Sequence, residues 1–328
     1  MKRTLIALAL VSVTAGAYAA GSTPVINGGD GTNEIYTRGD TSFFLGGRAE
    51  FRGDFVGTDT GDDIDGTMAD KSRARINIGG VSAISESLSA FGFYEAEQAT
   101  ADDSELSQRY AYVGLMSNYG AVSFGKQNTA NVQLSNMSDI ATYTGDQKAF
   151  LDAGNEQQTN NISYIGQFDA LRVQASYIAG EEADTDGYGL SAIYSLPMGL
   201  DLGLGYTGAD EGQEQITAGA SYTSCHFYAG LTYTTGDTAQ VFGDTVDFEG
   251  YEFAAQYLFD NNFRVIGAYQ NQQIDGDDVS DFMELTGGYD FNKHVYAYLA
   301  YKFNQLDGDD ITKQGGEDSM RVGLKYTF

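Results

Sequence analysis

The most constraining feature of this sequence is an alternation of polar and apolar residues over segments of about ten residues, which recurs along the chain. Over 319–328, for example, every second residue is apolar and the residues between are polar or Gly. Successive side chains of a strand point to opposite faces, so such a segment has one apolar and one polar face. Repeated segments of this kind, separated by turn residues, are typical of strands that cross a membrane as a closed barrel, apolar toward lipid and polar toward the lumen.

Sixteen segments fit this pattern, and an even number is usual in bacterial outer-membrane barrels. The sequence therefore predicts an all-β fold, a 16-stranded antiparallel transmembrane β-barrel. The predicted strands are 41–54, 71–83, 87–98, 106–117, 121–126, 161–168, 171–179, 188–196, 200–208, 214–224, 226–236, 249–259, 263–274, 281–291, 295–305 and 317–328.

The first residues have the pattern of a signal peptide, 1–19. Lys2 and Arg3 precede a short apolar run, and Ala17-Tyr18-Ala19 is a small-x-small cleavage site. Residues 20–40 are predicted to form an N-terminal arm, in which Glu34–Thr37 pair briefly with the last strand. Its first part, Ala20–Asn33, is also expected to enter the periplasmic mouth and narrow the pore. Residues 41–328 form the barrel domain.

The net charge restricts the class of partner. With 18 Lys+Arg and 46 Asp+Glu, the chain carries −28, which excludes nucleic acid as a partner and attracts cations. A charge this high can indicate disorder, but disordered chains are poor in aromatic residues, and here they make up 13%. Cys225 is the single cysteine, so no intramolecular disulfide is possible.

The longest connection without alternation is 127–158. A structureless loop of this length inside a compact domain is usually functional. We expect this third external loop to fold into the lumen as a constriction loop, with Asp139, Asp146, Asp152 and Glu156 where solutes pass. The alternative is a disordered external loop.

Basic residues share the polar face of the first, second and fourth strands: Arg48, Arg73, Arg75 and Arg109, with Glu95 as an acidic partner. On the fourth strand, Arg109 is expected on the face opposite to Tyr110 and Tyr112. Neighbouring strands lie about 4.8 Å apart, so these arginines form a ladder on one wall. A transverse field between this wall and the loop acids would orient solutes. The alternative is a set of ordinary solvated polar residues.

Motifs for catalysis, a cofactor or a metal are not found. The chain has no zinc spacing, phosphate-binding loop or nucleophile elbow, and its two histidines fall at tight turns. The acidic clusters 59–65, 275–278 and 307–310 lack the spacing of a calcium loop. They are interpreted as solvated external loops, with divalent-bridged contact to lipopolysaccharide as the alternative. The predicted catalytic, cofactor and metal sites are therefore none.

Several short segments, in this order along the chain, resemble the Gram-negative general porins, and most closely the OmpU-type porins of vibrios and their relatives. The segments are Leu45–Glu50, Ser72–Arg75, Gly92–Glu95, Ser138–Ile140 and Phe303–Asp307.

The resemblance implies a homotrimer of sixteen-stranded barrels in the outer membrane of a Gram-negative bacterium, in contact with lipopolysaccharide. It implies that Arg48, Arg75 and Arg109 belong to the basic wall, Glu95 to its acid and Asp139 to the loop acids. Phe328 matches the C-terminal residue that such barrels present to the barrel insertion machinery. Thr142–Asp146 departs from the family's loop motif, because Tyr143 replaces its second acid.

The function expected is passive diffusion of ions and small hydrophilic solutes through a water-filled pore, with a preference for cations and no enzymatic activity. One alternative is a substrate-specific channel of the same fold, for which Phe91 and Phe93 on a polar face are the only indication. Another is a barrel that acts mainly as an adhesin through its loops. A membrane-embedded hydrolase is a third, and no Ser–His pair at a strand end supports it.

Overall fold

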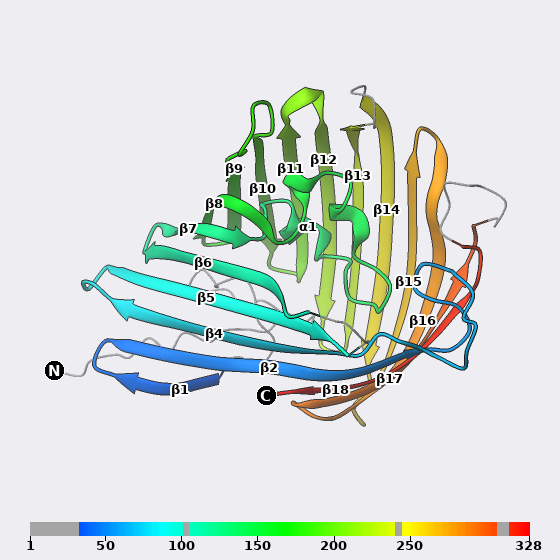
Figure 1. The fold of residues 1–328 in the computed structure, drawn as a ribbon. Helices are drawn as coiled ribbons and strands as arrows, with labels where there is room; N and C mark the ends of the chain where they lie inside the picture. Colours follow the sequence, from blue (N-terminus) through cyan, green and yellow to red (C-terminus); the bar gives the residue numbers. More distant parts are fainter. Residues whose placement is uncertain (1–32, 101–104, 240–244, 307–314) are drawn as a thin grey trace.

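The computed structural model describes residues 33–100, 105–239, 245–306 and 315–328, which form a closed antiparallel β-barrel (Figure 1). The predicted signal peptide and residues 20–32 of the predicted arm lie outside the described residues. Among the described residues, none of the helices has the length and apolar character needed to cross a membrane.

Sixteen strands of the described chain make the ring, each antiparallel to the next, and β18 pairs with β2 to close it. The predicted sixteen-stranded barrel is confirmed. The strands are β2 (Thr41–Asp54), β4 (Arg73–Ala83), β5 (Leu88–Ala99), β6 (Ser107–Ser117), β7 (Gly120–Gln127), β8 (Gln158–Phe168), β9 (Leu171–Ile178), β10 (Gly187–Leu196), β11 (Leu200–Ala209), β12 (Glu214–Ser224), β13 (Phe227–Ala239), β14 (Thr245–Leu258), β15 (Phe263–Ile274), β16 (Asp277–Asn292), β17 (Val295–Asn304) and β18 (Ser319–Thr327).

Two short strands lie outside the ring, β1 (Asn33–Arg38) and β3 (Ala69–Asp70). The prediction that Glu34–Thr37 pair with the last strand is wrong, because β1 pairs with β2 over Thr41–Leu45. The reason is that β18 already pairs with β2 from Arg48 onward, and Phe328 exchanges backbone hydrogen bonds with Gly47 at 3.0 and 3.1 Å. β1 therefore pairs with the part of β2 that lies beyond the end of β18.

The predicted alternation determines which side chains face outward. On β18, Leu324 and Tyr326 are 49% and 50% exposed, whereas Ser319 and Arg321 are 0% and 2% exposed. The same holds on β11, where Leu202 and Leu204 are exposed. A large exposed apolar surface with a buried polar face is the reverse of a water-soluble domain and fits a barrel surrounded by lipid.

The alternation fails on β6, where the prediction for Tyr110 and Tyr112 is wrong. The register between β5 and β6 shifts at Glu95, which pairs with Tyr110, while Ala96 pairs with Gln108. Arg109 is thus an extra residue in the strand, a β-bulge. Because the bulge advances the alternation by one residue, Arg109, Tyr110 and Tyr112 all lie on the polar face.

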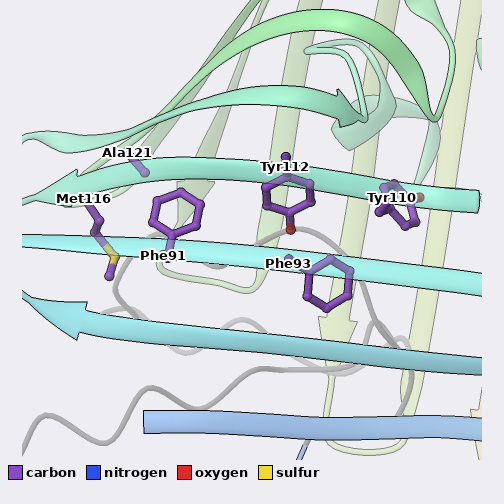
Figure 2. Packing of buried hydrophobic residues seen from close by; sticks show 6 residues of the cluster. All are labelled: Phe91, Phe93, Tyr110, Tyr112, Met116 and Ala121. Atoms are coloured by element: carbon purple, nitrogen blue, oxygen red, sulfur yellow. The ribbon is translucent and has the colours of Figure 1, made fainter. Parts of the chain in front are cut away.

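The tyrosines join an apolar cluster on that face (Figure 2). The rings of Phe93 and Tyr112 are 5.5 Å apart between centroids, and Phe91 meets Tyr112 edge-on at 6.4 Å. In this cluster, aromatic residues of β5 and β6 occupy the polar face of the barrel. Its members are Phe91, Phe93, Tyr110, Tyr112, Met116 and Ala121.

The connection from β7 to β8 contains no strand, and we call residues 128–157 the long segment. It includes the short helix α1 (Val132–Ser135) and the 3-10 turns η1 (Asp146–Lys148) and η2 (Asp152–Gly154). A further 3-10 turn, η3 (Asp210–Gly212), connects β11 to β12. α1 packs against β10, β11 and β12 (Figure 1).

Candidate functional site

The four predicted arginines of the wall lie together with acids between them. Register places Arg48 beside Arg75 and Glu50 beside Arg73 on β2 and β4. Glu50 accepts from Arg73 Nε at 3.1 Å and pairs with Arg48 at 3.7 Å. Arg48 and Arg75 are thus like charges side by side, and the acids close to them relieve the repulsion that a purely basic row would suffer.

Two acids from the third predicted strand extend the ladder. Glu97 accepts a hydrogen bond from Arg75 and pairs with Arg73 at 3.6 Å. Glu95, 1% exposed, accepts from Arg109 Nε at 2.9 Å, as predicted for the wall acid. Sequence reasoning missed Glu50 and Glu97 as partners, although their alternation with the arginines was visible.

A fifth arginine, Arg52, connects this wall to the long segment. Its Nε donates to Tyr298 Oη at 3.3 Å, and its Nη2 donates to the carbonyl of Thr142 at 3.5 Å. Tyr298 in turn donates to Glu50 at 3.0 Å. The charged ladder is therefore continuous with the backbone of the long segment.

Away from the charged wall, the long segment contacts strands that carry little charge. Glycines on the polar faces of β11, β12 and β13 leave room for α1 and the residues after it. A Cβ added at Gly203 would lie 2.4 Å from Leu134, and one at Gly230 would lie 1.7 Å from the carbonyl oxygen of Met137. Gly205 and Gly219 are similarly close to Leu134 and Met137. A larger side chain at Gly230 would collide with backbone of the segment, whereas at the other three positions the ends of the Leu134 and Met137 side chains would have to move.

Hydroxyl and amide groups complete this neutral contact. Ser138 donates to Thr232 Oγ1 at 2.8 Å, and Gln133 donates to Ser191 at 2.7 Å. All four side chains are buried. These neutral groups give Ser138 and Gln133 hydrogen-bond partners without placing an unpaired charge in the contact.

Two buried glutamates hold the backbone of the long segment. Glu284, 3% exposed, accepts from the N–H groups of Thr142 and Tyr143 at 2.8 and 2.9 Å. Glu252, 0% exposed, accepts from Gly145 N–H at 2.7 Å. Hydrogen bonds from backbone N–H to a carboxylate are among the stronger ones in proteins. Sequence reasoning missed both residues, because β14 and β16 each carry several acids and the sequence does not distinguish these two from the others.

Lys148 is a further residue that the sequence interpretation missed. Its Nζ lies 3.0 Å from Asp139 Oδ2 and 3.3 Å from Glu156 Oε1. Burial alone would lower the pKa of Lys148, but the carboxylates of Asp139 and Glu156 outweigh it and raise this pKa above its usual range. Glu156 also lies 4.0 Å from Arg109 Nη2. Asp139, predicted to face the basic wall, is thus paired within the segment itself.

Asp146 and Asp152 differ from the other acids of the long segment. Both side chains are exposed, and neither makes an ion pair with any residue that the structure describes. The protein packed around Asp146 raises the pKa of its carboxyl, and the Asp139 carboxylate adds to this against the effect of Lys148. These two side chains therefore offer negative charge to solvent.

Tyr143, which stands where the family's second loop acid is expected, covers a buried ion pair. Its ring lies 4.5 Å from the guanidinium of Arg321, and its hydroxyl is 2.9 Å from Ser319 Oγ. Arg321 donates twice to Asp54, at 2.6 and 2.7 Å. Asp59, predicted to be a solvated loop acid, instead lies 3.2 Å from Arg321 and 3.1 Å from Lys71.

A metal site is not formed by the described residues, since no three His, Cys, Asp or Glu side chains among them lie close enough to hold an ion. The acidic cluster 307–310 lies outside the described residues. His226 lies 3.5 Å from Asp260, and the His294 ring is 2.8 Å from the carbonyl of Thr327. The described arrangement is one of fixed charges and hydrogen bonds facing a polar interior, which can filter ions and solutes.

Comparison with known proteins agrees with this geometry. The sequence profile of the Gram-negative porin family matches residues 5–309. Outer membrane protein U of Vibrio parahaemolyticus is 35% identical, and Porin-like protein L of Photobacterium profundum is 32% identical, each over the whole of both chains. Outer membrane protein U of Vibrio vulnificus is 39% identical over 72% of this chain and 69% of its own length.

Solved structures share the fold at lower identity. OmpF of Salmonella typhi, in complex with daunomycin, superposes with a TM-score of 0.77 at 22% identity, covering 90% of this chain and all of that one. The trimer form of OmpT of Vibrio cholerae has a TM-score of 0.68 at 17% identity, over 88% of this chain and all of that one. An anion-selective porin from Comamonas acidovorans has 0.72 at 20% identity, over 88% of this chain and all of that one.

The predicted resemblance is confirmed by the family match and by full-length relatives above 30% identity. A closed barrel with an apolar exterior and a polar interior has the structure that a channel requires. Porins are channels, and a channel makes and breaks no bonds. This chain belongs to the Gram-negative porin family and is an outer-membrane channel protein, not an enzyme.

Proposed function

We propose that this porin is a general diffusion channel in which the long segment lies in the lumen and narrows it. The observation that carries the proposal is the set of contacts between the long segment and the polar faces of strands from β10 to β18. They include Gln133 with Ser191, Ser138 with Thr232, and Tyr143 with Ser319. A segment held on both sides by polar faces of a closed barrel reduces the cross-section that remains for water.

Cation preference is the second part of the proposal. Asp146 and Asp152 offer unpaired negative charge, whereas Arg48, Arg73, Arg75 and Arg109 are each close to a glutamate or paired with one. Charged side chains that line a narrow passage attract counter-ions and repel ions of like sign. The wall arginines and loop acids are the groups that we propose to line the constriction, with Asp139 and Glu95 inside its charge network.

The assembly and its surroundings follow from the family. We propose a homotrimer, since the OmpT neighbour is described as a trimer form, with lipopolysaccharide around its outer rim. We further propose that residues 1–19 are removed on export and that the exposed C-terminal Phe328 is presented to the barrel insertion machinery. Mass measurement of the purified outer-membrane protein tests the cleavage after Ala19.

Planar bilayer recording tests the proposed function. We expect stepwise single-channel conductance and a reversal potential under a potassium chloride gradient with the sign of cation selectivity. Closures in three equal steps would support the trimer. Folded protein that gives no conductance steps, or steps selective for chloride, would overturn the proposal.

A substrate-specific channel is a second candidate, favoured by the aromatic cluster of Figure 2. Aromatic rings on a polar face provide a surface for sugars or other ring-shaped solutes. Here the rings are buried, with Phe91 and Phe93 at 5% exposure, so the general pore is the better account. Solute flux into liposomes that saturates with concentration would favour the specific channel, and flux proportional to concentration would exclude it.

A further inference from the structure

The inference concerns Lys148, the single basic residue between Gln127 and Gln158. It is 9% exposed and is therefore not a solvated surface lysine. Its Nζ lies between two carboxylates of the long segment, 3.0 Å from Asp139 and 3.3 Å from Glu156. A lysine this buried needs such partners, because an ammonium group without them is strongly destabilised.

The charges continue from Lys148 to the barrel wall. Glu156 lies 4.0 Å from Arg109, whose Nε donates to Glu95 at 2.9 Å. The sequence of charges is therefore acid, base, acid, base, acid, from Asp139 to Glu95. In such a chain each carboxylate has a cation beside it, so its field falls off faster with distance than the field of an isolated charge.

The acids outside this chain contrast with those inside it. Asp146 and Asp152 are exposed and make no ion pair within the described ranges. Four carboxylates on the segment are therefore not equivalent, although the sequence alone gives no reason to rank them. Only two of them, Asp146 and Asp152, are both exposed and outside any ion pair of the described residues, although the charge of Lys148 is also felt at Asp146.

We propose that Lys148 is a specificity-determining residue of the pore, which neutralises Asp139 and Glu156 and leaves Asp146 and Asp152 to attract cations. This inference rests on the proposed function, because it requires the long segment to line the conducting passage. It places the selectivity of the channel under the control of one internal counter-charge. Removal of that charge should make the pore more cation-selective.

The test is the ratio of potassium to chloride permeability, measured from reversal potentials of intact protein in planar bilayers. For Lys148→Gln, we expect this ratio to rise roughly two- to threefold, the effect of one elementary charge a few ångströms from the ion path in water. For Glu156→Gln, we expect a shift in the opposite direction. Lys293→Gln is the matched control, because it removes the same charge from an exposed turn residue and should leave the ratio unchanged.

A double variant separates charge from structural damage. Lys148→Gln combined with Asp139→Asn removes one charge of each sign, so the ratio should return toward that of the wild type. An unchanged or lower ratio in Lys148→Gln would overturn the inference, as would a double variant that resembles the single one. If Lys148→Gln does not fold, Glu156→Gln is the test. A lower ratio of potassium to chloride permeability in that variant supports the inference, and an unchanged or higher ratio overturns it. A wild-type protein without cation selectivity would instead refute the proposed function, so the two failures are distinguishable.

Discussion

Two sides of the barrel interior are built from different chemistry. On β2, β4, β5 and β6 the polar face is a ladder of arginines and glutamates, with Arg73 and Glu50 at 3.1 Å as its centre. On β10–β13 the polar face consists largely of Gly, Ser and Thr, and the long segment packs there through contacts such as Ser138 with Thr232. A close-packed backbone needs small neutral neighbours, whereas charged groups need water or partners. The difference fits the proposal that a segment of this length rests on one side of the interior and faces charges on the other.

The largest expected effect comes from the charged side. Arg321→Met leaves Asp54 buried at 0% exposure without its partner. Breaking one half of a buried ion pair destabilises a protein by about 3–5 kcal/mol. We expect a loss of this size in the free energy of unfolding, measured by urea titration in lipid vesicles. Asp54→Leu together with Arg321→Met should recover most of it, and a double variant as unstable as the single one would contradict the explanation.

Glu284 on β16, which holds the backbone of the long segment, gives the next largest effect. Glu284→Ala leaves the N–H groups of Thr142 and Tyr143 without their acceptor. Each buried donor left unpaired costs about 1–3 kcal/mol. We expect Glu284→Ala to be less stable than Glu284→Gln, which retains one acceptor oxygen, and to be cut faster by protease within the long segment. Equal stability of the two variants would show that these hydrogen bonds are not needed.

The neutral side is tested by its glycines. Gly230→Ala places a Cβ against the carbonyl of Met137, which is backbone and cannot rotate away. Overpacking of this kind costs about 1–3 kcal/mol, and the displaced segment should change the single-channel conductance. Gly267→Ala is the control, since a Cβ there meets nothing within 4 Å. Similar conductance in both variants would mean that the segment does not depend on this contact.

The smallest effect is a pH dependence. Because the pKa of Asp146 is raised, its carboxylate becomes protonated at a higher pH than an ordinary aspartate does. The cation preference should be complete above this pKa and decline as the pH falls through it. Reversal potentials recorded across a pH series check this, with Asp146→Asn expected to lack that part of the decline. An identical pH profile in the variant would assign the titration to another group.

The barrel was predictable from the sequence because the alternation repeats in most of the strands. An apolar face that must meet lipid allows only one register for each strand. The common face of the wall arginines was predicted from the same period of two. The face of Tyr110 and Tyr112 was not, because a single extra residue at Arg109 shifts the alternation and no local signal in the sequence marks this bulge. The partner of β1 was also predicted wrongly. β18 pairs with β2 only as far as the hydrogen bonds between Phe328 and Gly47, and the sequence does not show which part of β2 is left for β1.

The contacts of the long segment were harder to predict because they join residues far apart in the chain. Glu284 and Tyr143 are separated by 141 positions. One signal was present, since Gly203, Gly205, Gly219 and Gly230 all occupy polar-face positions of neighbouring strands, where glycine indicates close approach of another backbone. The pairing of Lys148 with Asp139 depends on turns in the segment that have no periodic pattern.

A cysteine tether tests the central claim most directly, namely that the long segment rests on the β13 wall while the pore conducts. Ser138→Cys and Thr232→Cys, in a Cys225→Ser background, replace two side-chain oxygens that lie 2.8 Å apart. We predict that a disulfide forms in the outer membrane, seen by mass spectrometry, and that oxidised and reduced channels have the same conductance and ion selectivity. Failure of the bond to form in folded barrels, or a pore that opens wider only when the bond is reduced, would contradict the account.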